Sequence, residues 1–86
     1  MPIISQFYGI IIRMFYNDHA PPHFHAIYGE YELLICISPI TILEGKAPGR
    51  VRSMVLEWAA LHQIELLENW ERCRQAEPLS SVDPLE

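Results

Sequence analysis

The amino-terminal half of the chain shows the short β-branched and alternating segments that are typical of strands. Residues 7–16 are rich in β-branched and aromatic side chains and contain no breaker after Gly9, so they predict a first strand. Residues 23–28 and 31–38 predict two further strands, because turn-forming residues bound both of them. Between these two, Gly29-Glu30 suits a two-residue hairpin loop, in which glycine supplies the positive φ angle that such turns require.

The pattern becomes helical in the second half of the chain. Residues 40–43 predict a short fourth strand, and Pro48 fits the first turn of a helix, where its missing N–H costs nothing. Apolar residues then follow one stripe at helical spacing: Val51, Met54, Val55, Trp58, Leu61 and His62. The later apolar positions, Ile64, Leu67 and Trp70, leave that stripe by roughly a quarter turn or more. We therefore expect a break near residues 62–64, and we expect both tryptophans to be core anchors.

These patterns predict an α+β fold: a three- or four-stranded antiparallel sheet followed by two C-terminal helices, or by one kinked helix. A straight helix with two apolar faces is the alternative, in which Leu56, Ile64 and Leu67 dock a second subunit. A single domain is expected over residues 1–76, because 86 residues lie below the usual domain size. Residues 77–86, which include two prolines, are expected to form a flexible tail.

Charge and cysteine content narrow the functional classes. The formal net charge is −5, and most of the acidic excess lies in residues 61–86, so generic binding to nucleic acid is not expected. No apolar stretch approaches the roughly 18 residues of a membrane span, and the first residues lack the basic region of a secretory signal. Cys36 and Cys73 lie far apart and are expected to be free thiols. These features together predict a cytoplasmic protein.

Two histidines stand out on the predicted second strand. If Gly29-Glu30 is the hairpin loop, strand pairing places His25 opposite Leu34 and His23 opposite Cys36. Alternation along the strands then puts both histidines and Cys36 on the same face of the sheet. Directly opposed residues have Cβ atoms about 5 Å apart, so His23, His25 and Cys36 are expected to converge.

A divalent transition metal is the cofactor that this cluster suggests. Two histidines at i and i+2 on a strand suit zinc, copper, iron or nickel, and the third ligand would be Cys36 or His19, the latter from the proline-stiffened loop before the strand. The spacing is not that of a zinc finger. Two other interpretations stay open: the histidines hydrogen-bond on a half-exposed face with no ligand, or they contact a protein partner.

A catalytic role would use His23 or His25 as a general base, with Asp18 or Glu32 orienting the ring. Cys36 beside His23 would in that case be an activated thiolate, although a cysteine on a strand is more often a small buried hydrophobic residue. The sequence contains no glycine-rich phosphate loop and no nucleophile elbow. The residues alone therefore leave open whether the protein is an enzyme.

Several segments of the chain resemble one bacterial family. They are Phe7 to His19, Pro21-Pro22-His23-Phe24-His25, Tyr28-Gly29-Glu30, Leu43-Glu44-Gly45-Lys46 and Glu68-Asn69-Trp70-Glu71. Across residues 5–80 the sequence is similar to the domain-of-unknown-function family numbered four-one-six-zero, and the Pro-Pro-His-Phe-His block is the most specific motif. The resemblance implies a small cytosolic bacterial protein encoded beside another small protein, in a layout like toxin–antitoxin pairs. It implies no catalytic residue, and it implies an acidic residue in relatives where this chain has Cys36.

Two functions follow from these observations. The first is a non-enzymatic interaction module that acts with a co-encoded small protein in a toxin–antitoxin-like pair, or that forms a homo-oligomer. Its contact surface would be the sheet face around His23 and His25, or the helical face around Leu56 and Leu67. The second is a metal-dependent or histidine-assisted enzyme, such as a nuclease-like toxin, in which His19, His23 and His25 are the working groups.

Overall fold

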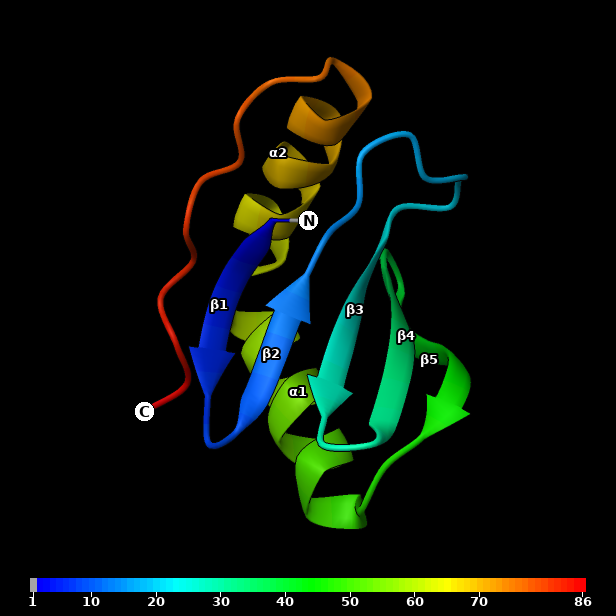
Figure 1. The fold of residues 1–86 in the computed structure, drawn as a ribbon, viewed down its shortest axis with the longest axis vertical. Coiled ribbons are helices and arrows are strands. Elements are labelled where there is room, and N and C mark those ends of the chain that lie inside the picture. The colour runs from blue at the N-terminus through cyan, green and yellow to red at the C-terminus, as the bar shows by residue number, and fades with distance from the viewer. Residues whose placement is uncertain (1) are drawn as a thin grey trace.

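The computed structural model describes residues 2–86 and shows one antiparallel sheet with two helices behind it (Figure 1). The strands are β1 (Ile3–Phe7), β2 (Ile10–Arg13), β3 (His23–Tyr28), β4 (Tyr31–Ile37) and β5 (Ile40–Lys46). They lie in the sheet in chain order, and each is antiparallel to the next. The helices α1 (Gly49–Leu61) and α2 (Gln63–Arg74) follow. The predicted α+β class is confirmed, with five strands in the sheet.

The prediction of a single strand over residues 7–16 is wrong. Strands β1 and β2 form a hairpin around Tyr8 and Gly9, whose φ angles are +50° and +80°. Positive φ at both central residues is the geometry that two-residue hairpins favour, and glycine adopts it without steric cost. Gly9 therefore marks a turn between two strands, and β1 was missed because the apolar run hides this turn.

The β3–β4 hairpin agrees with the prediction in both its turn and its register. His23 pairs with Cys36 and His25 pairs with Leu34. Strand β5 continues to Lys46 instead of ending at residue 43, with an irregular register beside Leu34. Gly45 makes this extension feasible, because its φ is +101° and a Cβ there would collide with the backbone carbonyl of Glu32.

The helical part breaks where the apolar stripe shifts. His62 stands between α1 and α2 with φ −123° and ψ 25°, outside helical geometry, and its N–H donates to the carbonyls of Trp58 and Ala59. The prediction of two helices is confirmed. Because of the break, α2 can turn Leu66 and Trp70 toward the sheet, and both are buried.

The hydrophobic core lies between the sheet and the two helices. It contains apolar residues from every strand except the edge strand β5 and from both helices, the largest fully buried side chains being Trp58, Phe24, Ile4, Ile10, Ile12, Met14, Leu33, Ile35, Ile37 and Leu66. The two tryptophans are buried as expected. Leu56 and Leu67 are partly buried and pack against this core, and their predicted contact with a partner stays a prediction.

Residues 77–86 form neither helix nor strand, and the segment runs beside β1 (Figure 1). The N–H of Val82 donates to the carbonyl of Ile4 at 2.7 Å, and Val82 is only 4% exposed. The indole N–H of Trp58 donates to the carbonyl of Asp83 at 2.7 Å. Flexibility of this tail stays a prediction, and motion of the segment would have to break these contacts.

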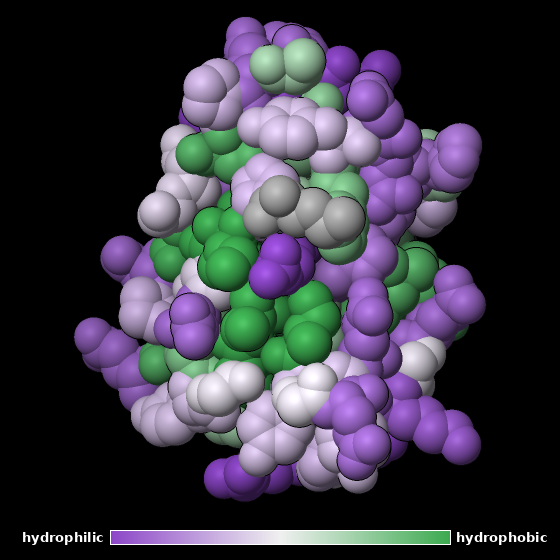
Figure 2. Space-filling view, in the orientation of Figure 1, coloured by the Kyte–Doolittle hydropathy of each residue, from purple (hydrophilic) through white to green (hydrophobic). Residues whose placement is uncertain are grey.

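The face of the sheet opposite the hydrophobic core carries the site described below, and α2 reaches the site at the first residue of β3 through Trp70. Figure 2 shows apolar residues gathered over the middle of this face, with polar residues around them. Half-buried Ile27 and Leu34 lie on the same side of the sheet as His25. Within residues 2–86, neither helix has the length and apolar character that a membrane crossing requires.

Candidate metal centre

The site forms where the loop between β2 and β3 returns to the sheet. Strand β2 ends at Arg13, and the chain re-enters the sheet at His23. Asn17 takes a left-handed conformation with φ +62°, which asparagine tolerates better than most residues. This loop brings Asp18 to the first residues of β3, where His23 and His25 project from the same face because they are two positions apart.

Asp18, His23 and His25 form a compact group. Each offers one ligand atom, and these atoms lie within 4.8 Å of one another. The Nε2 atoms of His23 and His25 lie 2.9 Å and 3.4 Å from the same carboxylate oxygen, Oδ2 of Asp18. The side chain of His23 is 8% exposed, that of His25 17% and that of Asp18 26%, so the group is shielded but open to solvent on the Asp18 side.

The hydrogen-bond partner of His23 fixes the role of each ring nitrogen. Its Nδ1 lies 2.7 Å from the carbonyl oxygen of Pro21, which can only accept, so Nδ1 carries a proton and donates. In a neutral ring Nε2 then holds a lone pair, and that lone pair faces the carboxylate of Asp18. Two acceptors at 2.9 Å repel each other unless a proton or a metal cation lies between them.

His25 repeats this arrangement with a different partner. Its Nδ1 lies 2.9 Å from Oε2 of Glu32, a residue on the neighbouring strand β4, and its Nε2 is directed at Asp18. A carboxylate that accepts from one ring nitrogen while the other nitrogen faces the site is the usual support of a metal-binding histidine. In both histidines Nδ1 has a hydrogen-bond partner, and Nε2 is directed at Oδ2 of Asp18.

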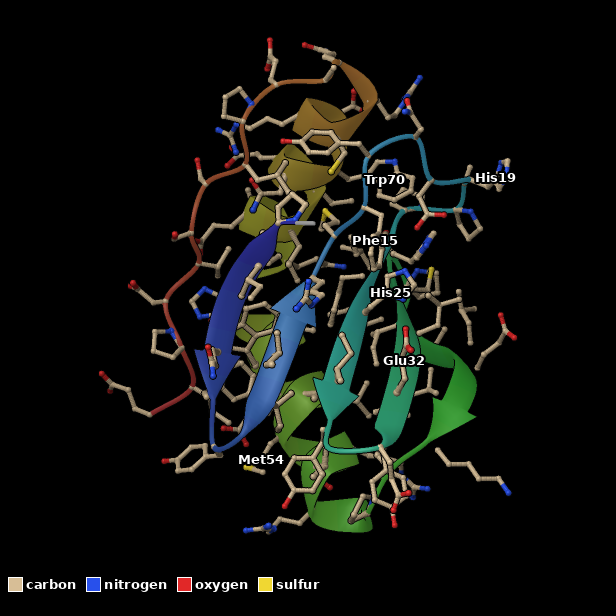
Figure 3. All side chains as sticks on the ribbon, in the orientation of Figure 1. Phe15, His19, His25, Glu32, Met54 and Trp70 are labelled. Atoms are coloured by element: carbon tan, nitrogen blue, oxygen red, sulfur yellow. The ribbon has the colours of Figure 1, made fainter. Side chains whose placement is uncertain are left out.

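Two aromatic rings hold the histidines in place. Phe15 meets His25 edge to face, with ring centroids 4.4 Å apart, and Trp70 lies 5.1 Å from His23. Figure 3 shows Phe15 and Trp70 near His25, with Glu32 on its other side. Packing of this kind limits rotation of the two rings, so the directions of the Nε2 atoms are set by the fold.

The electrostatics keep the Asp18 carboxylate ionised. Burial alone would raise the pKa of Asp18, but hydrogen bonds from His25, from the backbone N–H of His19 and from His23 outweigh it, so the pKa lies below its ordinary value. On α2, burial raises the pKa of the Cys73 thiol, and the negative charge of Asp18 adds to this effect.

The donor set fits a transition-metal ion. Metal–nitrogen and metal–oxygen bonds of about 2.0–2.1 Å put neighbouring ligand atoms about 2.9–3.4 Å apart, for angles between a right angle and the tetrahedral one. The distances from Nε2 of His23 and of His25 to Oδ2 of Asp18, 2.9 Å and 3.4 Å, fall in this range. Two histidines and one carboxylate are the ligands of catalytic zinc sites and of non-haem iron sites, which keep further positions open.

Two of the four predicted ligands belong to this group and two do not. His19 is exposed on the loop, where Figure 3 shows it at the outer end, away from His25. Cys36 is buried and pairs with His23 across the strands, but it is not part of the group found among the described residues. Metal binding by His19 or Cys36 stays a prediction.

Asp18 was foreseen as an orienting carboxylate and not as a ligand. The sequence signal was present, because Asp18 stands directly before His19 in a loop that ends five residues later at His23. The sequence does not predict the path of the loop. That path brings Asp18 to the two histidines of β3 and leaves His19 exposed.

Hollows flank the group on two sides. One, of about 300 Å³, is lined by His25, Glu32, Leu34 and Glu44. The other, of about 330 Å³, includes Asp18, and Trp70 and Arg74 of α2 form part of its wall. Small molecules can therefore approach the group from the surface.

Comparisons with known proteins place the chain in a family without assigning it an activity. Neither the curated proteins nor the solved structures gave a match. The family model described as Domain of unknown function (DUF4160) matches residues 9–71, a range that contains all three members of the candidate metal centre as well as Glu32 and Trp70. The match spans well over half of the chain, and the protein therefore belongs to the DUF4160 family.

Proposed function

We propose that this protein is a metal-dependent protein, which binds one divalent transition-metal ion through Nε2 of His23, Nε2 of His25 and the carboxylate of Asp18. The observation that carries the proposal is the orientation of the two rings. Each Nδ1 is engaged by an acceptor, Pro21 or Glu32, and each Nε2 is directed at one oxygen of Asp18.

Charge balance also supports the proposal. Two neutral imidazoles and one carboxylate give a divalent ion a net charge of about +1 at the centre, which is the balance of catalytic His₂-carboxylate zinc sites. Glu32 and Glu44 lie nearby and add negative charge at the adjacent hollow. A metal cation at this point would take the place of the proton that the contact between Nε2 of His23 and the Asp18 carboxylate otherwise requires.

The chemistry that fits this centre is hydrolysis. With three protein ligands, an ion keeps positions for water or substrate, and a bound divalent ion makes water acidic enough to give a nucleophile near neutral pH. His23 and His25 hold the centre, Glu32 positions the ring of His25, and Phe15 and Trp70 restrict access from the sides of the rings.

The test is metal binding by chelator-treated, untagged protein, measured by titration calorimetry and elemental analysis. We expect about one ion per chain for the wild type, and loss of binding in His25→Ala and in Asp18→Asn. His19→Ala and Cys36→Ser serve as matched variants, because each removes a metal-binding side chain that lies outside the group. Both should keep one ion per chain.

Circular dichroism of each variant shows whether loss of metal reflects loss of fold. If the wild type takes up no ion at micromolar concentrations of Zn²⁺, Fe²⁺, Mn²⁺, Co²⁺ or Ni²⁺, the proposal is wrong. If folded His19→Ala or Cys36→Ser protein loses the ion while Asp18→Asn keeps it, the ligand set is the one that includes those residues, and the three-residue centre is refuted.

A further inference from the structure

A second feature of the molecule lies at the junction of the two helices, in the groove between the last turns of α1 and the last residues of the tail. Its volume is about 470 Å³, in the range of about 300–1,000 Å³ that ordinary ligand pockets cover. Leu61, Pro84 and Leu85 give it apolar walls, and Glu57, Asp83 and Glu86 give it carboxylates. None of these residues takes part in the metal centre.

The groove is built by the anchored part of the tail. The indole of Trp58 holds the carbonyl of Asp83, and the buried Val82 hydrogen-bonds to Ile4 on β1. These contacts fix the tail residues just before Pro84 and Leu85, so the wall opposite α1 has a defined position. Leu85 also packs against the core, which joins the apolar side of the groove to the interior.

Large apolar side chains are exposed at this junction of α1 and α2. Leu61 is 67% exposed and lines the groove, and Ile64, on the first turn of α2, is 74% exposed. They are the two most exposed of the large hydrophobic side chains in the described part of the chain. One exposed leucine is ordinary on a protein surface, but a leucine at the mouth of an apolar-walled groove gives a partner an area to bury.

The charge of the groove selects the kind of partner. Its lining contains three carboxylates and neither lysine nor arginine, and the ring nitrogen Nδ1 of His62, the one basic group there, lies 2.7 Å from the Glu65 carboxylate. Arg72 and Arg74, the basic residues of α2, bond to Asn69 and Glu71 on their own helix. The groove is therefore both apolar and negative.

We propose that this groove binds a basic amphipathic segment of a partner protein, with apolar side chains seated between Leu61 and Leu85 and lysines or arginines facing Glu57, Asp83 and Glu86. Helix-in-groove recognition of this kind uses apolar anchors at i, i+3 and i+4. Nucleic acids and anionic membrane surfaces are disfavoured, because they carry the same sign of charge as the groove. A metal ion is disfavoured too, since the group with metal-binding distances found in residues 2–86 lies elsewhere.

The probe for the test is a short fluorescent peptide with leucines on one helical face and lysines on the other. A matched peptide with glutamate in place of lysine is the negative control. Fluorescence anisotropy at low and at high salt should show binding of the lysine peptide that weakens with salt, and no binding of the glutamate peptide. Shifts of backbone amide signals near Leu61 and Leu85 in NMR spectra should accompany binding.

Two sets of variants with the same change of net charge locate the site. Glu57→Gln, Asp83→Asn and Glu86→Gln together should weaken the peptide about ten-fold, from the sum of three exposed charge contacts. Glu30→Gln, Glu68→Gln and Glu77→Gln together remove three charges outside the groove and should leave the affinity within about two-fold. Leu61→Ser should weaken binding, whereas Leu43→Ser, at another exposed leucine, should not.

Four results would overturn the proposal. The first two concern the peptides: the lysine peptide does not bind, or the glutamate peptide binds as tightly as the lysine peptide. The third is an equal loss of peptide affinity in both triple variants. The fourth is dimerisation of the chain through Leu61, followed by light scattering, which would assign the groove to a second copy. The measurement does not depend on metal content, so its failure leaves the metal centre untouched, and failure of the metal centre leaves the groove untouched.

Discussion

Glu32 offers a test that separates a metal centre from a structural hydrogen-bond cluster. Its carboxylate accepts from Nδ1 of His25 at 2.9 Å, while its own side chain is 57% exposed. In the proposed metal centre this contact would fix the tautomer and direction of the His25 ring, and Glu32 is not one of the proposed ligands. Glu32→Gln keeps the size of the side chain and removes its charge.

The expected magnitudes differ for the two roles. As an exposed contact, the pair contributes about 0.2–1 kcal/mol to the free energy of unfolding, so the metal-free variant should unfold within about 1 kcal/mol of the wild type. As support for a metal-binding histidine, it should contribute roughly ten- to hundred-fold in metal affinity, or about 1.4–2.7 kcal/mol. The loss in affinity should therefore exceed the loss in stability.

Calorimetric metal titration and urea unfolding, both on chelator-treated protein, measure the two quantities. Glu30→Gln in the same hairpin is the matched control, because it removes one charge without touching His25, and it should change neither quantity by more than about 0.5 kcal/mol. Equal metal affinity for Glu32→Gln and wild type would refute the argument that Glu32 orients His25 for metal binding. A stability loss with no bound metal in either protein would identify a structural cluster.

Three further predictions concern the fold. Gly45→Ala should lower the free energy of unfolding by roughly 1–3 kcal/mol in urea unfolding, because its Cβ meets the Glu32 carbonyl, whereas Gly29→Ala, at positive φ in open space, should cost about 1 kcal/mol. Val82→Ala should cost about 2 kcal/mol by the same measurement, because two buried methyl groups of the tail leave the core. Cys36 and Cys73 are buried free thiols and should react with iodoacetamide far more slowly in native than in unfolded protein, as followed by mass spectrometry. Fast native labelling of either thiol, or a tail variant as stable as the wild type, would contradict the packing described above.

The sequence predicted most of the fold because its local signals and its long-range packing agree. The Gly29-Glu30 turn set the register of β3 and β4, and the shift in apolar periodicity placed the break at His62. The β1–β2 hairpin was missed because its turn, Tyr8-Gly9, lies inside an apolar run that also reads as one continuous strand. Periodicity finds elements well, but a tight turn between two short strands changes the pattern by only two residues.

The candidate site was predictable to the extent that it lies in regular structure. Alternation on β3 placed His23 and His25 on one face, and their hydrogen bonds now show that their Nε2 atoms converge. The third member of the group comes from a loop, and spacing alone could not choose between Asp18, His19 and Cys36. The choice depends on the loop conformation, which in turn depends on contacts with distant parts of the chain.

Those distant contacts explain why the centre depends on more than its motif. The strand register fixes the positions of the two histidines. Asp18 lies on a loop that contacts the carboxy-terminal part of the chain. Within that loop the hydroxyl of Tyr16 donates to the carbonyl of Glu77 at 3.0 Å, and at its end the ring of His23 packs against Trp70 of α2. The sheet therefore presents the imidazoles, Trp70 of α2 packs on the ring of His23, and the tail is bonded to the loop that carries Asp18. A chain that kept the Pro-Pro-His-Phe-His motif but lost the tail would keep the strand register of the two histidines and lose the hydrogen bond between Tyr16 and Glu77 that ties the Asp18 loop to the tail.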